Sequence, residues 1–241
     1  MFFSNPTIKG NKLLKFIEWG VILIIPLFLI CGCKSSNPSI IIESDCAAPC
    51  WREIRPGETT QEELLTSINE MPDVKPASVK VHGQPWKIFT DIIEFEMLTN
   101  EEVEIYMLDD KVAEITFSGK NLATFEQSVE KFGEPDYIIN IQSFGPGILF
   151  TEAQHNFIMA LKPEKGVMYG YDTYYIPKSQ RPEIKPDIKI RWIDFFDANS
   201  YKELLDAKMF SMGMLDGTET VKRFQPWVGY GSLQEKYPLV K

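Results

Sequence analysis

The sequence predicts an α+β fold made of two helix-plus-antiparallel-sheet repeats and an aromatic-rich C-terminal extension. Three observations predict it. Two segments carry helix-capping signals together with a helical hydrophobic period. Each of these segments is followed by short runs in which apolar and polar residues alternate, as half-buried strands do. Aromatic residues then concentrate toward the C-terminus.

The N-terminal segment has the charge order of a secretory signal. Lys9, Lys12 and Lys15 precede a charge-free apolar run over residues 19–33. A membrane-spanning helix needs about 20 apolar residues, so this run is too short to span comfortably. We therefore expect residues 1–32 to be a signal peptide.

The apolar run ends in Ile30, Cys31, Gly32 and Cys33, which resembles the bacterial lipobox. The resemblance implies cleavage before Cys33 and attachment of a diacylglyceryl lipid to its thiol. Two acyl chains make membrane attachment stable, whereas one is marginal. The chain would then be anchored at a cell membrane or the cell surface, facing the extracytoplasmic side. An uncleaved signal anchor is the alternative; lipid on Cys31 instead would put bulky Leu29 and Ile30 at the small-residue positions.

Residues 33–50 are expected to be a lipidated tether that ends in a cysteine pair. Besides Cys33, Cys46 and Cys50 are the thiols that the exported chain keeps. In an oxidising compartment such a pair favours a disulfide, and a separation of four residues with Pro49 between them fits a tight turn. A redox couple is the alternative, but the spacing is not Cys-x-x-Cys and no thioredoxin-like pattern follows.

The charge balance restricts the partners. The leader contains three of the 25 basic residues and one of the 34 acidic residues, which leaves the mature chain with a net charge of −11. This charge argues against a nucleic-acid partner and against a second, electrostatic attachment to an anionic membrane surface.

The first predicted repeat covers residues 51–119. Thr60 and Glu63 have the spacing of a capping box, so a helix is expected from about Gln61 to Asn69. A loop punctuated by proline ends this helix. The alternating segments that follow are joined by short turns and predict an antiparallel meander over residues 78–89, 91–98, 102–108 and 111–117.

The second predicted repeat covers residues 120–180. Thr124 and Gln127 repeat the capping-box spacing, and Gly133 followed by Pro135 ends the helix. The apolar face of this helix is formed by Phe125, Val129 and Phe132. Strands are expected at residues 137–142, 147–153, 156–163 and 167–177.

The segments "GETTQEELL" and "TFEQSVEKFGEPDYI" resemble the signatures of small α+β domains in outer-membrane assembly lipoproteins of the BamE/SmpA type and in beta-lactamase-inhibitor-like (BLIP-like) proteins. In that pattern Gly-x-Thr precedes a short helix, Gly-x-Pro follows it, and an antiparallel sheet covers it. The first copy has the Gly-x-Thr at Gly57 but lacks Gly-x-Pro, and the second shows the reverse, with Gly-x-Pro at Gly133. The resemblance covers residues 51–165 and implies this fold, but a fold does not carry a function.

Residues 181–241 are expected to be an extension with a strand in "IKIRWIDFF" and a helix in "NSYKELLDAKMF". Its aromatic residues either fill core or form a groove for a peptide, glycan or protein. Trp227 and Tyr230, beside Gly229 and Gly231, are the predicted partner-binding residues. The "PCW" and "PWVGYG" sequences resemble those of uncharacterised bacterial lipoproteins.

No catalytic residue, metal site or cofactor is predicted. The two histidines, His82 and His155, do not have the spacing of metal ligands, and no nucleotide-binding or hydrolase motif is present. Glu94, Glu96 and Glu104 alternate with apolar residues and are interpreted as a solvated sheet face, with a cation site or a surface for a basic partner as alternatives. The segment 194–200 lacks the glycine and distal glutamate of a calcium loop.

We therefore expect a lipid-anchored protein of the cell envelope that is not an enzyme and acts as an interaction or assembly module. Its partners would be the membrane, through the lipid on Cys33, and an envelope protein. An envelope enzyme acting on a glycan or on thiols is one alternative, and an inhibitor-like binder of a secreted enzyme is another.

Overall fold

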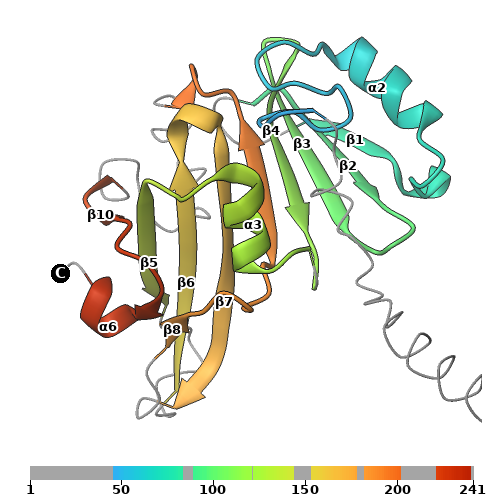
Figure 1. Cartoon of the computed structure of the whole chain (residues 1–241). Helices are drawn as coiled ribbons and strands as arrows, with labels where there is room; N and C mark the ends of the chain where they lie inside the picture. The colour runs from blue at the N-terminus through green and yellow to red at the C-terminus, as the bar shows by residue number, and fades with distance from the viewer. Residues whose placement is uncertain are drawn as a thin grey trace, which may run out of the picture. The chain divides into compact units, whose positions relative to one another are not determined.

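A computed structural model describes residues 46–83, 89–120, 122–143, 153–177, 182–201 and 221–239 (Figure 1). All of them belong to one compact unit, residues 38–241. No helix in these ranges is both long enough and apolar enough to cross a bilayer.

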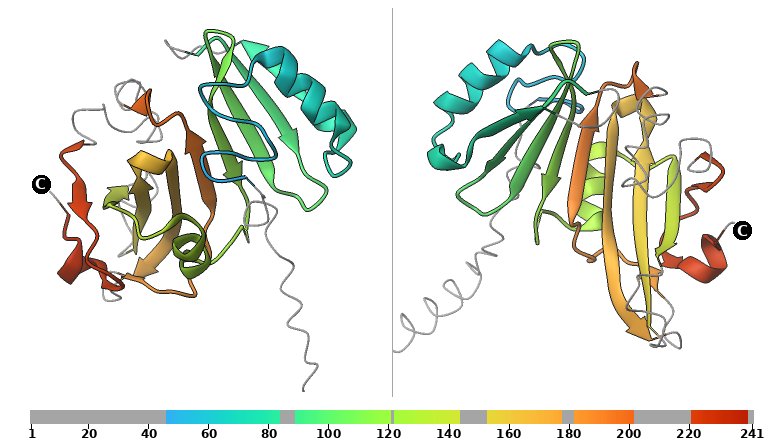
Figure 2. Two further views of the ribbon diagram at one scale, coloured as in Figure 1. Left: turned by 45° about the horizontal axis from the view of Figure 1, so that its top comes forward. Right: turned by 180° about the vertical axis from the view of Figure 1, so that it is seen from behind.

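The main sheet runs in the order β1-β2-β3-β4-β9-β7-β6-β5-β10, and its described neighbours all pair antiparallel (Figure 2). Its strands are β1 (Lys80–Gly83), β2 (Asp91–Glu96), β3 (Glu102–Leu108), β4 (Lys111–Ser118), β5 (Tyr137–Ser143), β6 (Ala153–Lys162), β7 (Val167–Pro177), β9 (Trp192–Phe196) and β10 (Phe224–Pro226). A separate antiparallel pair joins β8 (Glu183–Ile184) to β11 (Gly231–Ser232). The expected α+β class is therefore confirmed.

The first helix, α2 (Gln61–Glu70), begins at the predicted capping box. The Glu63 N–H donates to Thr60 Oγ1 at 3.4 Å, and the Thr60 N–H donates to Glu63 Oε2 at 2.9 Å. These bonds satisfy two backbone donors that a helix N-terminus otherwise leaves free. Leu64 and Ile68 are buried and turn this helix toward the core.

The second helix, α3 (Phe125–Phe132), is built in the same way. Thr124 and Gln127 form its capping box, and Gly133 ends it with φ of +86°, a conformation that favours glycine. Phe125 and Phe132 are fully buried, as the sequence predicted. The described residues also include the short helical segments η1 (Pro76–Ser78), η2 (Pro163–Lys165) and α6 (Leu233–Lys236).

The strand order is mirrored about the pairing of β4 with β9. In the first half, α2 is followed by β1 to β4, which approach the centre of the sheet in chain order. In the second half, α3 is followed by β5, β6, β7 and then β9, which approach the centre from the other side. Thr116 and Asp194 face each other in the central register. Each half is therefore one helix and four antiparallel strands.

Both helices cover the same face of the main sheet, because their buried side chains share one core with the strands (Figure 1). That core includes Leu64, Ile68, Phe95, Ile105, Phe117, Phe125, Phe132, Tyr169 and Phe195. Trp51 joins it with its indole 5.0 Å from the Phe117 ring and 6.3 Å from the Phe95 ring, measured between centroids. A second buried cluster, with Met159, Met168 and Phe196, lies on the opposite side of the sheet, the far face.

The segment predicted as a C-terminal extension contributes to the main sheet. β9 lies between β4 and β7 at its centre, and β10 pairs with β5 at its edge. Residues beyond the boundary expected near 181 are therefore part of the main sheet itself and do not only pack over it. Most of the helix expected in residues 199–210 and most of the strand expected at 147–153 lie outside the described residues.

Candidate functional site

The predicted lipidation site, Cys33, lies outside the described residues, whereas the cysteine pair beyond it is described. Cys46 and Cys50 are joined by a disulfide with their Cα atoms 5.6 Å apart. Cys50 and the adjacent Trp51 are buried, and Arg52 forms a bidentate ion pair with Asp73. The disulfide thus lies at the point where the chain enters the core.

We expect the double replacement Cys46→Ser and Cys50→Ser to lower the free energy of unfolding by about 2 kcal/mol or less. A disulfide that closes so short a loop removes little entropy from the unfolded chain. Urea unfolding of both proteins measures the difference, and thiol labelling with and without denaturant reports the bridge. Two thiols that react before denaturation in the unmodified protein would contradict the bond.

The predicted partner-binding residues, Trp227 and Tyr230, are half-buried and pack against α3. The Trp227 ring stacks on Phe125 at 5.7 Å and on Tyr237 at 6.0 Å, and the Tyr230 ring meets Phe125 edge-on at 5.9 Å. The Tyr237 hydroxyl donates to the Gly229 carbonyl at 2.8 Å and holds this turn in place. The contacts favour the packing interpretation of these aromatics, and a binding role for them stays a prediction.

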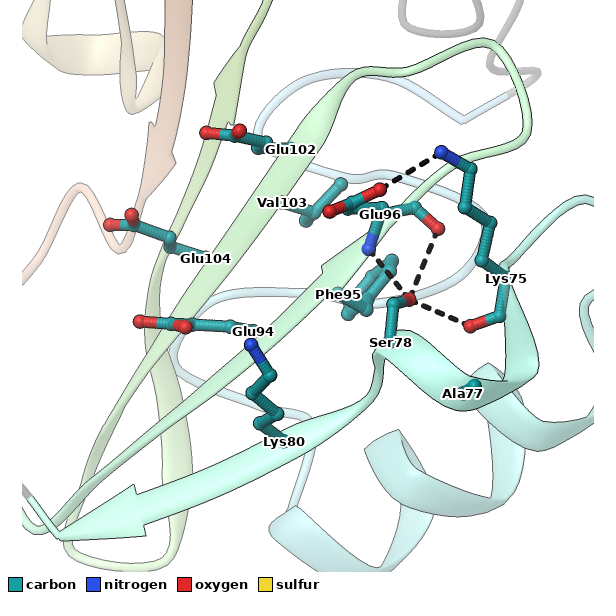
Figure 3. Close-up of a pocket in the computed structure, with 10 residues that line it drawn as sticks. All are labelled: Lys75, Ala77, Ser78, Lys80, Glu94, Phe95, Glu96, Glu102, Val103 and Glu104. Atoms are coloured by element: carbon teal, nitrogen blue, oxygen red, sulfur yellow. Dashed lines mark hydrogen bonds and ion pairs between the residues drawn. The ribbon is translucent and has the colours of Figure 1, made fainter.

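The far face carries the acidic residues of β2 and β3. A hollow of about 490 Å³ is lined by residues that include Glu94, Glu96, Glu102 and Glu104, and Figure 3 shows them projecting from the two strands. Lys75 Nζ lies 2.9 Å from Glu96 Oε2, and this hydrogen bond lowers the pKa of Glu96. His82, which is exposed on β1, lies 2.9 Å from Glu94. Solvent exposure of Glu96 and Glu102 agrees with the interpretation of a solvated face.

Two further acids on this face are buried, and no pattern in the sequence predicts their burial. Glu114 on β4 and Asp194 on β9 are 3% and 4% exposed, respectively. Burial raises the pKa of Glu114, and the charges of Asp194 and Glu104 raise it further. Burial also raises the pKa of Asp194 to about 7, with a hydrogen bond to Thr116 acting against it. Both groups therefore stay protonated at pH values well above those at which an ordinary carboxyl group loses its proton.

The pair does not complete a metal site. Glu114 Oε2 has no hydrogen-bond partner, and the described residues contain no group of three or more potential ligands placed to hold a metal ion. A carboxylate without a cation or donor beside it is costly in a protein interior, so the protonated form is favoured. What this arrangement can do chemically is keep protons on buried carboxyl groups at pH values where exposed carboxyl groups have lost theirs.

A second hollow of about 720 Å³ lies farther along the same face. Residues from strands of both halves line it, including Glu102 on β3, Trp192 on β9 and Asp172 on β7. Trp192 is one of the aromatic residues of the predicted C-terminal extension. No pattern in the sequence indicated that Trp192 lines a hollow, and Trp227 was the tryptophan predicted to bind a partner. Its partner in the sheet register, Gly170, lies on the neighbouring strand β7.

The topology and these surfaces define the class of protein: an α+β protein with two helices on one face of an antiparallel sheet and an acidic, hollowed surface on the other. Comparison with protein-family models, with curated proteins and with solved structures finds no match.

Proposed function

We propose that this chain is a lipid-anchored protein of the cell envelope, held to the membrane by a diacylglyceryl group on Cys33. The sequence that supports this is Ile30-Cys31-Gly32-Cys33 after a charge-free apolar run. The Cys46–Cys50 disulfide, which lies just beyond this sequence, supports the proposal most directly. Structural disulfides persist in oxidising compartments and are rare in a reducing cytosol, so the bond supports an extracytoplasmic location.

We further propose that the protein acts without catalysis, as an interaction or assembly module for an envelope protein. The mirrored order of the main sheet, with a capped helix at the start of each half, supports a tandem arrangement of BamE-like or beta-lactamase-inhibitor-like repeats. The helices α2 and α3 cover one face of the sheet, and the parts of the far face that carry the charged hollows stay open for contacts. A charge-lined face of this kind suits orientation and partner selection.

The replacement Cys33→Ser tests the anchor. We expect the variant to leave the membrane fraction, or to remain there as an uncleaved precursor of higher mass, because no thiol is present at the lipid-acceptor position. The matched control is Cys31→Ser, because Cys31 lies close to Cys33 but within the signal peptide that is cleaved off. It should remain lipidated and membrane-bound.

Fractionation and gel mobility measure both variants. A Cys33→Ser protein of mature size that stays in the membrane fraction would contradict the proposal, and so would loss of lipidation in Cys31→Ser alone.

A further inference from the structure

The larger hollow on the far face crosses the contact between the two halves. Its wall is built by neighbouring strands: Glu102 from β3, Ser118 from β4, Trp192 from β9, Asp172 from β7 and Phe157 from β6. In the register, Glu102 faces Ser118, and Ser118 faces Trp192. The side chains therefore form a continuous row along one end of the sheet.

Two aromatic rings form one part of this hollow. The Trp192 and Phe157 ring centroids lie 6.3 Å apart, with the ring planes tilted by 52°. Trp192 pairs with Gly170 across β9 and β7, and a Cβ atom on Gly170 would lie 2.5 Å from the indole. The ring can rest against the β7 backbone because residue 170 has no side chain. Both rings are only partly buried, so part of each remains exposed in the hollow.

Polar groups of both signs surround the rings. The side chain of Asp172 is only 8% exposed, and Arg191 Nε lies 3.9 Å from its Oδ1 atom. The Arg191 N–H donates to the Gly170 carbonyl at 2.8 Å, which fixes the guanidinium-bearing residue beside the rings. Glu101 presents a buried Oε2 atom without a hydrogen-bond partner, and Lys120 adds a second cation to the lining.

We propose that this hollow binds a saccharide. A pyranose ring has a face of C–H groups that packs on an aromatic ring, and its hydroxyl groups both donate and accept hydrogen bonds. Carboxylates such as Asp172 accept these bonds, and guanidinium groups such as Arg191 donate them. Ligand sites combine apolar contact area with a few placed polar groups in this way. The volume of about 720 Å³ has room for more than one sugar unit.

The mixed charge of the hollow favours a sugar over the other ligands that aromatic rings attract. A nucleic acid would meet Glu101, Glu102 and Asp172, and the whole chain is acidic. A quaternary ammonium ion prefers a cage of rings, whereas here two rings lie beside two cations, Lys120 and Arg191. Saccharide binding goes beyond the proposed function, and this binding does not depend on the lipid anchor.

Isothermal titration calorimetry of the full chain purified in detergent tests the proposal, with cellohexaose, chitohexaose and maltohexaose as probes. We expect saturable binding of at least one of them, with a Kd of about 1 mM or tighter. Trp192→Ala should weaken that binding at least tenfold. Arg191→Gln, at a side chain that is 40% exposed, should also weaken it about tenfold while circular dichroism shows that the variant is folded.

Arg223→Gln, a partly buried arginine outside the hollow, is the matched control and should bind as the unmodified chain does. The proposal is overturned if none of the three hexasaccharides binds saturably at about 5 mM. It is also overturned if Arg191→Gln and Trp192→Ala both bind normally, or if choline binds and the sugars do not. Loss of membrane attachment in Cys33→Ser would leave this result unaffected, so failure here and failure of the anchor are distinguishable.

Discussion

Phe125→Ala is expected to lower the free energy of unfolding by about 3–5 kcal/mol, the range for truncating a buried phenylalanine. Phe125 is fully buried, and its ring meets Tyr169 at 5.2 Å, Trp227 at 5.7 Å and Tyr230 at 5.9 Å. The substitution removes the contact that joins α3 to β7 and to the C-terminal turn. Urea unfolding followed by circular dichroism measures the loss.

Leu98→Ala is the control, because Leu98 is 58% exposed in the turn after β2. Its effect should stay within about 0.5 kcal/mol, as is usual for surface substitutions. Since the two halves share one sheet and one core, Phe125→Ala should also keep a single unfolding transition. A loss below about 1 kcal/mol would contradict the described packing of α3, and a separate early transition of the second half would contradict the shared core.

The free energy of unfolding is expected to fall as the pH rises from about 4 to about 7. In the unfolded chain the carboxyl groups of Glu114 and Asp194 lose their protons near pH 4. In the folded protein both keep them to higher pH, to about 7 for Asp194. The folded state therefore binds more protons in this window, and stability must decrease as protons are removed. The stabilising effect is complete below pH 4 and is lost as the pH approaches 7.

The slope is at most about 1.4 kcal/mol per pH unit for each group. Asp194→Asn and Glu114→Gln keep the shape of the neutral carboxyl group without its titration, so each should flatten the decline. Glu102→Gln, an exposed acid on the same face, should leave the slope as it is. Chemical unfolding at a series of pH values gives these slopes.

Asp73 acts in the opposite direction, because the hydrogen bond and charge of Arg52 lower its pKa. Its contribution is present above pH 4 and is lost as the pH falls through its folded pKa, which lies below the window in which the buried acids titrate. The difference in slope between the variants and the unmodified protein therefore reports the titration of Glu114 and Asp194 alone. An unchanged slope in both Asp194→Asn and Glu114→Gln would show that these acids are ionised in the folded protein.

Local features of the fold were predictable from the sequence because they depend on neighbouring residues. The capping boxes at Thr60 and Thr124 need only the residue three positions on, and the positive φ of Gly133 follows from the helix stop signal. The bounds of β3 and β7 follow from alternation between turn residues.

The central strand and the hollow were not predictable, because they depend on pairing between distant segments. Nothing in residues 192–196 indicates that they insert between β4 and β7 rather than at an edge. Alternation places Glu114 on a polar face but does not say that this position becomes covered. The same limit applies to Trp192, whose place beside Phe157 requires the register of β6, β7 and β9.

The proposal that the chain is exported and lipid-anchored is tested most directly by mass spectrometry of the N-terminal peptide from membrane-purified protein. We expect a chain that begins at Cys33 and carries a diacylglyceryl group in thioether linkage to its sulfur. A membrane-bound chain with an unmodified Cys33, or one that still contains residues 1–32, would contradict it.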